Sequence, residues 1–83
     1  MRILLVEDNE ALADGLFAIL KGTGHAVDVV RDGASADAAI ASESFDLVIL
    51  DLTLPEMDGL DVLRGMRARS SKAAVLILTA RGA

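Results

Sequence analysis

Four short apolar segments recur along the chain, and polar residues follow each of them. They occupy residues 3–6, 27–30, 47–50 and 75–78, and they are rich in Leu, Ile and Val. Continuous apolar runs of this length are typical of strands buried on both faces of a parallel sheet. The second segment differs because it contains Asp28, and an internal charge favours an edge strand.

The stretches between these segments have the spacing of helices. Apolar residues recur every three or four positions at Leu12, Leu16, Ile19 and Leu20, at Ala36, Ala39 and Ile40, and at Leu60, Leu63 and Met66. Asp8 or Asn9 could cap the first helix, and Asp32 could cap the second. The order β-α-β-α-β-α-β predicts an α/β fold, a doubly wound parallel sheet with right-handed crossovers and helices on both faces.

Composition limits the kind of protein that this sequence can form. With 83 residues, the chain has room for a single domain, residues 1–83. It has no Cys, which excludes disulfides and Cys-ligated zinc. The net charge of −5 argues against a protein that binds nucleic acid or an anionic membrane by charge alone. The longest uncharged run, residues 73–80, is too short to span a bilayer, and we expect a cytoplasmic protein without membrane contact.

Acidic residues and a hydroxyl stand where three of the predicted strands end. Glu7 and Asp8 follow the first strand, Asp51 the third and Thr79 the fourth. In doubly wound sheets the ligand site lies outside the carboxyl ends of the strands. If the first and third strands are neighbours, about 4.8 Å apart, Asp8 and Asp51 can reach one ion. Oxygen ligands without His or Cys favour Mg²⁺, although Asp8 alone could equally serve as a helix cap.

Three sequence motifs resemble a known family. They are ILLVEDN at residues 3–9, DLVILDLTLPEMDGL at residues 46–60 and VLILTAR at residues 75–81. Together with their spacing, they resemble the receiver domain of response regulators in bacterial two-component signalling, and the resemblance covers the whole chain. The second and third motifs are similar to the OmpR/PhoB type, whose receivers usually precede a winged-helix DNA-binding domain.

The resemblance implies a role for each residue at the strand ends. Asp51 would be the phosphoacceptor, receiving a phosphoryl group from a sensor histidine kinase. Asp8 and Asp51 would ligate Mg²⁺, with Glu7 acting through water. Thr53 would contribute its backbone carbonyl to the metal, so that its side chain matters less, and Thr79 would be the switch hydroxyl. A carboxylate can attack phosphorus once a metal offsets the negative charge of both partners.

The sequence departs from the family at its C-terminal end. The family has a flavodoxin-like fold with strand order 2-1-3-4-5, and the predicted strands here stop at the fourth, which predicts the order 2-1-3-4. We therefore expect a receiver that lacks the last strand, its helices and the strand-five lysine, which Lys21 and Lys72 at helix ends cannot replace. Any DNA-binding domain would lie outside this chain. An exposed fourth strand would favour self-association or exchange of an element between copies.

Three other functions compete with a phosphoaccepting signalling domain that is not itself an enzyme. The chain could be a receiver fragment that is not phosphorylated and acts only in assembly. A haloacid-dehalogenase-type phosphatase also uses a strand-end Asp and Mg²⁺, but it needs a second Asp at the position of Thr53. A mononucleotide- or flavin-binding fold needs a phosphate-binding loop, and Glu7, Asp8 and Asn9 offer no glycines and the wrong charge.

Overall fold

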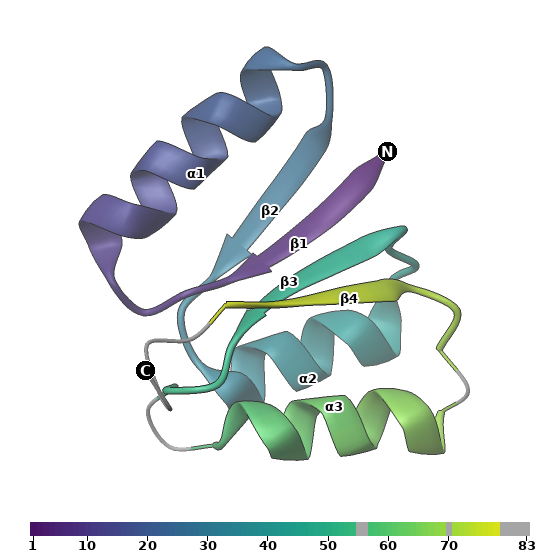
Figure 1. Ribbon diagram of the computed structural model, residues 1–83. Helices are drawn as coiled ribbons and strands as arrows, with labels where there is room; N and C mark the ends of the chain where they lie inside the picture. The colour runs from purple at the N-terminus through teal and green to yellow at the C-terminus, as the bar shows by residue number, and fades with distance from the viewer. Residues whose placement is uncertain (55–56, 70, 79–83) are drawn as a thin grey trace.

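One parallel sheet organises the chain (Figure 1). The computed structural model describes residues 1–54, 57–69 and 71–78. Its elements are β1 (Arg2–Val6), α1 (Glu10–Gly22), β2 (Ala26–Val30), α2 (Gly33–Ser42), β3 (Leu47–Asp51), α3 (Gly59–Ala68) and β4 (Ala74–Leu78). The strands are parallel and lie in the order β2-β1-β3-β4, which confirms the predicted topology and the edge position of the strand that carries Asp28.

The observed strands are slightly longer than the apolar runs that predicted them. β1, β2 and β4 each begin one residue earlier than expected, and β3 continues through Asp51. Asp51 pairs in register with Leu78 of β4, so its backbone belongs to the sheet. A residue held by the sheet ladder has a fixed backbone direction, and the end of β3 therefore sets the position of the Asp51 carboxylate.

Each face of the sheet has its own hydrophobic core. α1 covers one face, and α2 and α3 cover the other (Figure 1). Successive side chains of a strand point to opposite faces, so Leu4 and Leu50 belong to the core under α2 and α3, whereas Leu5 and Ile49 belong to the core under α1. All four side chains are almost completely buried. The two-faced burial explains why the sequence shows continuous apolar runs instead of alternation.

The two cores are unequal in size. Of the residues that the structure describes, ten buried ones form the core under α2 and α3, including Phe45 and Met66, and four form the core under α1. The side chain of Met66 fills space in the larger core and is fully buried. The sequence has two aromatic residues, Phe17 and Phe45, and Phe45 alone of the two belongs to a core. Phe17 is half-buried on α1, and the Lys21 amine lies 5.5 Å from the centre of its ring.

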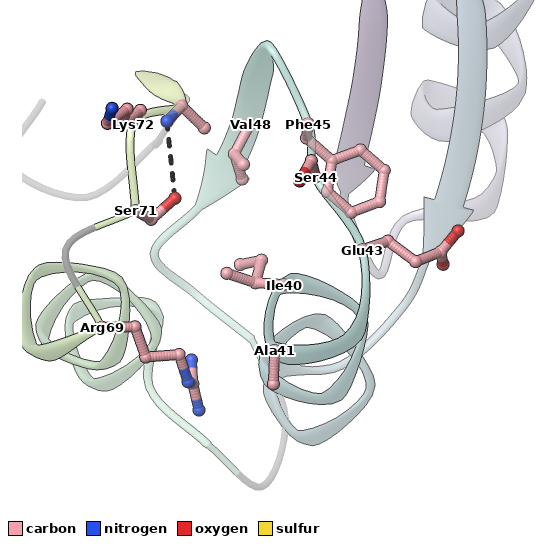
Figure 2. A pocket seen from close by; sticks show the side chains of 10 residues that line it. Ile40, Ala41, Glu43, Ser44, Phe45, Val48, Arg69, Ser71 and Lys72 are labelled. Carbon is pink, nitrogen blue, oxygen red and sulfur yellow. Dashed lines mark hydrogen bonds between the residues drawn. The ribbon is translucent and has the colours of Figure 1, made fainter.

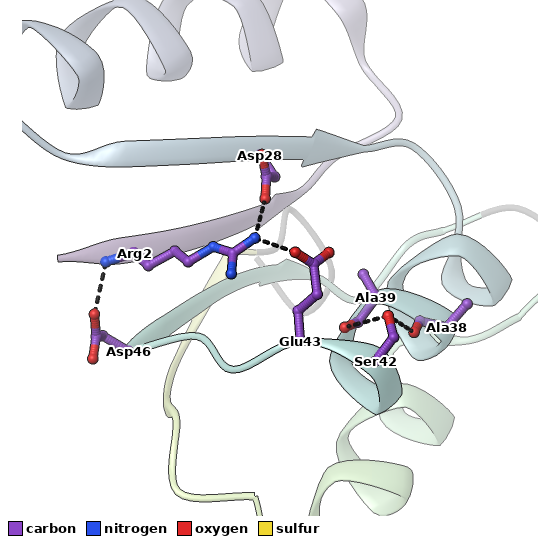
Figure 3. A network of polar contacts seen from close by, with 7 residues as sticks. All are labelled: Arg2, Asp28, Ala38, Ala39, Ser42, Glu43 and Asp46. Atoms are coloured by element: carbon purple, nitrogen blue, oxygen red, sulfur yellow. Dashed lines mark hydrogen bonds and ion pairs between the residues drawn. The ribbon is translucent and has the colours of Figure 1, made fainter.

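A network of charged residues joins the elements at the amino ends of the strands (Figure 3). The Arg2 guanidinium donates hydrogen bonds to Asp28 (3.2 Å) and to Glu43, and it lies 4.8 Å from the centre of the Phe45 ring. The backbone N–H of Arg2 donates to the Asp46 carboxylate at 2.7 Å. These contacts tie β1 to β2 on one side and to the connection between α2 and β3 on the other.

The outer strand β4 exposes apolar side chains. Leu76 is 51% exposed and Ile77 is 41% exposed, although both have strongly apolar side chains. Among the described residues, no strand pairs with the outer edge of β4. Within the same part of the chain, no helix has the length and apolar character needed to cross a membrane.

Candidate functional site

Three carboxylates converge at the carboxyl ends of the two central strands. Glu7 and Asp8 directly follow β1, and Asp51 is the last residue of β3, which lies beside β1 in the sheet. Each of the three offers a carboxylate oxygen that lies within 4.8 Å of the oxygens of the other two. Such a cluster could share one cation, as the spacing of adjacent strands predicted.

The start of α1 decides between the two roles that the sequence allowed for Asp8. Asn9 is the N-cap of α1, and its Oδ1 accepts a hydrogen bond from the Leu12 N–H at 3.0 Å. Because Asn9 satisfies the helix end, the cap does not require Asp8. The Asp8 side chain is exposed and contributes its oxygen to the carboxylate cluster.

The Asp51 carboxylate is nearly buried and is held by Thr53. Its exposed fraction is 7%. Asp51 Oδ1 accepts hydrogen bonds from the Thr53 N–H at 2.9 Å and from the Thr53 hydroxyl at 2.8 Å. Both donors sit two residues after the acceptor, so the loop that follows β3 orients the carboxylate. The side chain of Thr53 therefore touches Asp51, a contact that the sequence interpretation missed because it considered only the Thr53 carbonyl.

A glycine lets α3 begin close to the end of β3. Gly59 is buried, and a Cβ atom there would lie 2.7 Å from the Leu52 Cα and 2.8 Å from the Asp51 carbonyl oxygen. Backbone atoms cannot yield to such a contact as a flexible side chain can. Only glycine permits this approach, which keeps α3 packed against the strand that carries Asp51. The side chain of Asp58 caps α3 by accepting a hydrogen bond from the Leu60 N–H at 2.9 Å.

Glu7 is a carboxylate in an unfavourable place for a charge. Its side chain is only 2% exposed, and one oxygen accepts a hydrogen bond from the Asn9 N–H at 3.2 Å. Burial raises the pKa of Glu7 from 4.5 to about 7, and the neighbouring Asp51 carboxylate acts in the same direction. The Asp51 carboxylate acts in this direction because two close carboxylates repel each other when both are charged.

An open cavity of about 590 Å³ gives solvent and ligands access to the carboxylates. Glu7, Asp8, Asn9, Leu12, Leu16, Asp51, Thr53 and Leu78 line it. The polar lining offers oxygen donors and no sulfur or imidazole, which suits a hard cation such as Mg²⁺. The donor set and the raised pKa of Glu7 both fit a bound divalent cation, because such an ion would offset the mutual repulsion of the carboxylates.

The structure brings together four of the five residues predicted for the site. Glu7, Asp8, Asp51 and Thr53 all line the same cavity. The fifth, Thr79, lies outside the described residues. The sequence interpretation missed the apolar side of the cavity, which Leu12 and Leu16 form. Their helical spacing was visible, but it indicated only that they belong to one face of α1.

Comparison with known families gives a single result. The sequence matches the family described as "Response regulator receiver domain" over residues 3–83. It is 49% identical to the transcriptional regulatory protein QseB of Haemophilus influenzae and 47% identical to the response regulator protein PmrA of Pseudomonas aeruginosa, each over 98% of this chain. In both cases the chain spans 37% of the length of the relative. These relatives are regulators of the OmpR/PhoB type.

Solved structures of receiver domains have the same fold. The response regulator TrrA of Thermotoga maritima, solved in complex with Mg²⁺-BeF, is 33% identical with a TM-score of 0.90, over 98% of this chain and 70% of that one. The receiver domain of a sensor histidine kinase of Pseudomonas aeruginosa, solved with a magnesium ion coordinated in its active-site cleft, is 33% identical with a TM-score of 0.91. That match covers 96% of this chain and 67% of the other.

The fold, the clustered carboxylates and the similarity agree with one another. The strand order β2-β1-β3-β4 and the three helices reproduce the CheY-like arrangement of the receiver structures. The family match extends over nearly all of the chain, and the identity to several curated regulators is close to one half. The chain belongs to the receiver domains of two-component response regulators and is homologous to transcriptional regulators.

Proposed function

We propose that the chain is a phosphoaccepting receiver in which Asp51 takes a phosphoryl group from the phosphohistidine of a sensor kinase. The observation that carries the proposal is the cluster of Glu7, Asp8 and Asp51 at the ends of β1 and β3. Asp51 is the member of the cluster that the sheet and Thr53 hold in a fixed orientation. A nucleophile that is oriented before its substrate arrives loses less entropy in the reaction.

The proposed reaction exchanges one bond to phosphorus for another. A carboxylate oxygen of Asp51 attacks phosphorus, and the P–N bond of the phosphohistidine breaks with its electron pair moving to the imidazole nitrogen. Glu7 and Asp8 contribute negative charge beside the nucleophile, so an unassisted attack on an anion would be repelled. Thr79, as the switch hydroxyl, belongs to the proposal as well, on the strength of the family resemblance.

We propose Mg²⁺ as the cofactor of this reaction. Asp8, Asp51 and the Thr53 backbone carbonyl would hold the ion, and Glu7 would act on it through water. When bound, Mg²⁺ supplies positive charge that offsets the charge on the attacking and the transferred groups. The two solved relatives described above that contain magnesium support this choice, as do the carboxylate oxygens that line the cavity.

Phosphorylation by a small phosphodonor tests the proposal directly. With Mg²⁺ present, acetyl phosphate should add one phosphoryl group to the chain, seen as a mass increase, and Asp51→Asn should abolish it. Asp14→Asn is the matched control, because Asp14 is an exposed carboxylate on α1 outside the cavity. Labelling that persists in Asp51→Asn would refute the assignment of the acceptor. A parent chain that gains no phosphoryl group, although folded, would favour the alternative of a receiver that acts only in assembly.

We also propose that the protein regulates transcription through a part that lies outside this chain. The curated relatives are named transcriptional regulatory proteins, and the chain matches 37% of their length. The chain itself carries a net charge of −5, which disfavours contact with the DNA backbone. Any contact with DNA is therefore assigned to other segments of the protein.

Self-association of the 83-residue chain is a second proposed property. The outer edge of β4 carries Leu76 and Ile77, and an apolar strand edge is a template for pairing with another chain. Light scattering at micromolar concentration should detect a dimer or larger species, and Leu76→Lys should weaken it. Leu76 is the better position for this change because it is half exposed in the single chain. A folded monomer at that concentration would refute the proposal.

A further inference from the structure

A second cavity lies at the opposite end of the sheet from the carboxylates. It encloses about 380 Å³ at the amino ends of β3 and β4. Figure 2 shows its lining side chains gathered between the ends of α2 and α3. The cavity is at the small end of the range of volumes that ligand sites occupy, so a compact molecule would fill it. It shares no lining residue with the cavity at Asp51.

The inner wall of this cavity is apolar and rigid. Ile40, Phe45, Val48 and Ala73 form this wall, and each of these side chains is at least nine-tenths buried in the larger core. Atoms that are packed on their inner side have little freedom to collapse into the space in front of them. The wall therefore presents a preformed apolar surface, with the Phe45 ring as its largest part.

The rim of the cavity carries an excess of one positive charge. Arg69 is paired with Asp37 at 2.9 Å, and Glu43 shares the Arg2 guanidinium with Asp28. The Lys72 ammonium makes no ion pair with any residue in the described part of the chain. It is thus the cation that remains available on the rim of a protein whose net charge is −5.

Two hydroxyls line the cavity together with Lys72. Ser44 and Ser71 both line the cavity from its two loops, one on the side of α2 and the other on the side of α3. The Ser71 oxygen accepts a long hydrogen bond of 3.4 Å from the Ala73 N–H, which leaves its own hydroxyl hydrogen able to donate. Ammonium and hydroxyl donors above an apolar wall match a ligand with an anionic end and an apolar body.

We infer that this cavity binds a small organic anion with a flat apolar body, such as an aromatic carboxylate. The apolar body lies against Phe45 and Ile40, and the carboxylate faces Lys72 and the Ser71 hydroxyl. The apolar contact supplies most of the affinity, and the charge selects the anion over neutral molecules of the same shape. The site is independent of phosphorylation at Asp51, because the two cavities lie at opposite ends of the strands.

Titration of the ¹⁵N-labelled chain with 2-naphthoate, followed by amide NMR, tests the inference. We expect saturable shifts in residues 40–45 and 71–73, and clearly weaker binding of the neutral analogue 2-naphthamide. Lys72→Gln should weaken naphthoate binding by about threefold to fivefold, the size expected for one exposed charge. Arg67→Gln is the matched control, because Arg67 is a cation of the same helix end that does not line the cavity.

A second pair of variants tests the location without changing charge. Ala41 is exposed and lines the cavity, so Ala41→Leu should fill part of it and abolish binding. Ala38→Leu, at an exposed position of the same helix outside the cavity, should bind as the parent does. Equal binding of the acid and the amide would overturn the inference, as would equal effects of Lys72→Gln and Arg67→Gln. Shifts centred on the exposed residues of β4, or no binding at all, would overturn it too.

Discussion

The buried Glu7 carboxyl makes the stability of the chain depend on pH in a direction opposite to that of most acidic residues. Its pKa is raised from 4.5 to about 7 in the folded chain, so between these values the folded state binds more protons than the unfolded state. The free energy of unfolding must therefore fall as the pH rises through this window. The stabilisation is complete below the unfolded pKa and is lost as the pH passes the folded pKa.

The size of the effect follows from the distance between the two pKa values. A change from 4.5 to about 7 corresponds to about 3 kcal/mol of the free energy of unfolding, lost between about pH 5 and about pH 8. The total free energy of unfolding of a small domain is only about 5–15 kcal/mol, so this loss is a large fraction of it. The proposed Mg²⁺ ion would bind the ionised cluster, so millimolar Mg²⁺ should restore much of the stability at the higher pH.

Urea unfolding followed by far-UV circular dichroism measures this dependence, since the chain has no Trp or Tyr to report by fluorescence. Glu7→Gln should abolish most of the loss of stability between about pH 5 and about pH 8. The variant should be more stable than the parent at about pH 8. Glu10→Gln is the matched control, because Glu10 is 76% exposed at the start of α1. The reasoning is refuted if Glu7→Gln and Glu10→Gln keep the same pH dependence as the parent.

Three further substitutions test the packing around the site, each by urea unfolding. Gly59→Ala should destabilise the chain by about 1–3 kcal/mol, because the added Cβ meets backbone atoms, whereas Gly15→Ala, where nothing lies within 4 Å, should stabilise it by about 0.5–1 kcal/mol. Equal effects of the two would contradict this account. Asn9→Ala should remove the cap of α1 at a cost of about 1 kcal/mol, and an unchanged midpoint would show the cap to be unimportant. Met66→Ala should cost about 2–5 kcal/mol, because the side chain is fully buried, and a smaller loss would mean that the core closes around it.

The fold could be predicted from the sequence because its two central strands are buried on both faces. The consecutive apolar residues at 3–6 and 47–50 are typical of strands that are covered on both faces. Because these strands alternate with helices along the chain, the sequence predicts a parallel sheet. The predicted ends of the strands differ from the observed ends by one residue. Asp51 was expected to follow β3, yet it is part of the strand, because ladder pairing with Leu78 depends on the neighbouring strand and not on polarity.

The site was predictable as a set of residue types, and less so as a set of contacts. Asp8 and Asp51 stand at the ends of strands that the topology makes neighbours, so their approach could be expected from the sequence alone. The choice of Asn9 over Asp8 as the cap could not, because both side chains cap helices well. The hydroxyl contact of Thr53 with Asp51 also depends on the conformation of a loop, which apolar periodicity does not describe.

The unequal cores on the two faces of the sheet have a consequence for how the site opens. α1 contributes one fully buried side chain, Ala13, and the partly buried Leu16 and Leu20 to the smaller core, so detaching this helix exposes less apolar surface than opening the larger core would. Amide hydrogens of α1 should therefore exchange through partial opening, at a lower free energy than those of β1 and β3. Asp8 immediately precedes the cap of this helix, and each detachment of α1 releases it from the cluster. A cation bound at the cluster would hold Asp8 in place and would thus slow the amide exchange of α1.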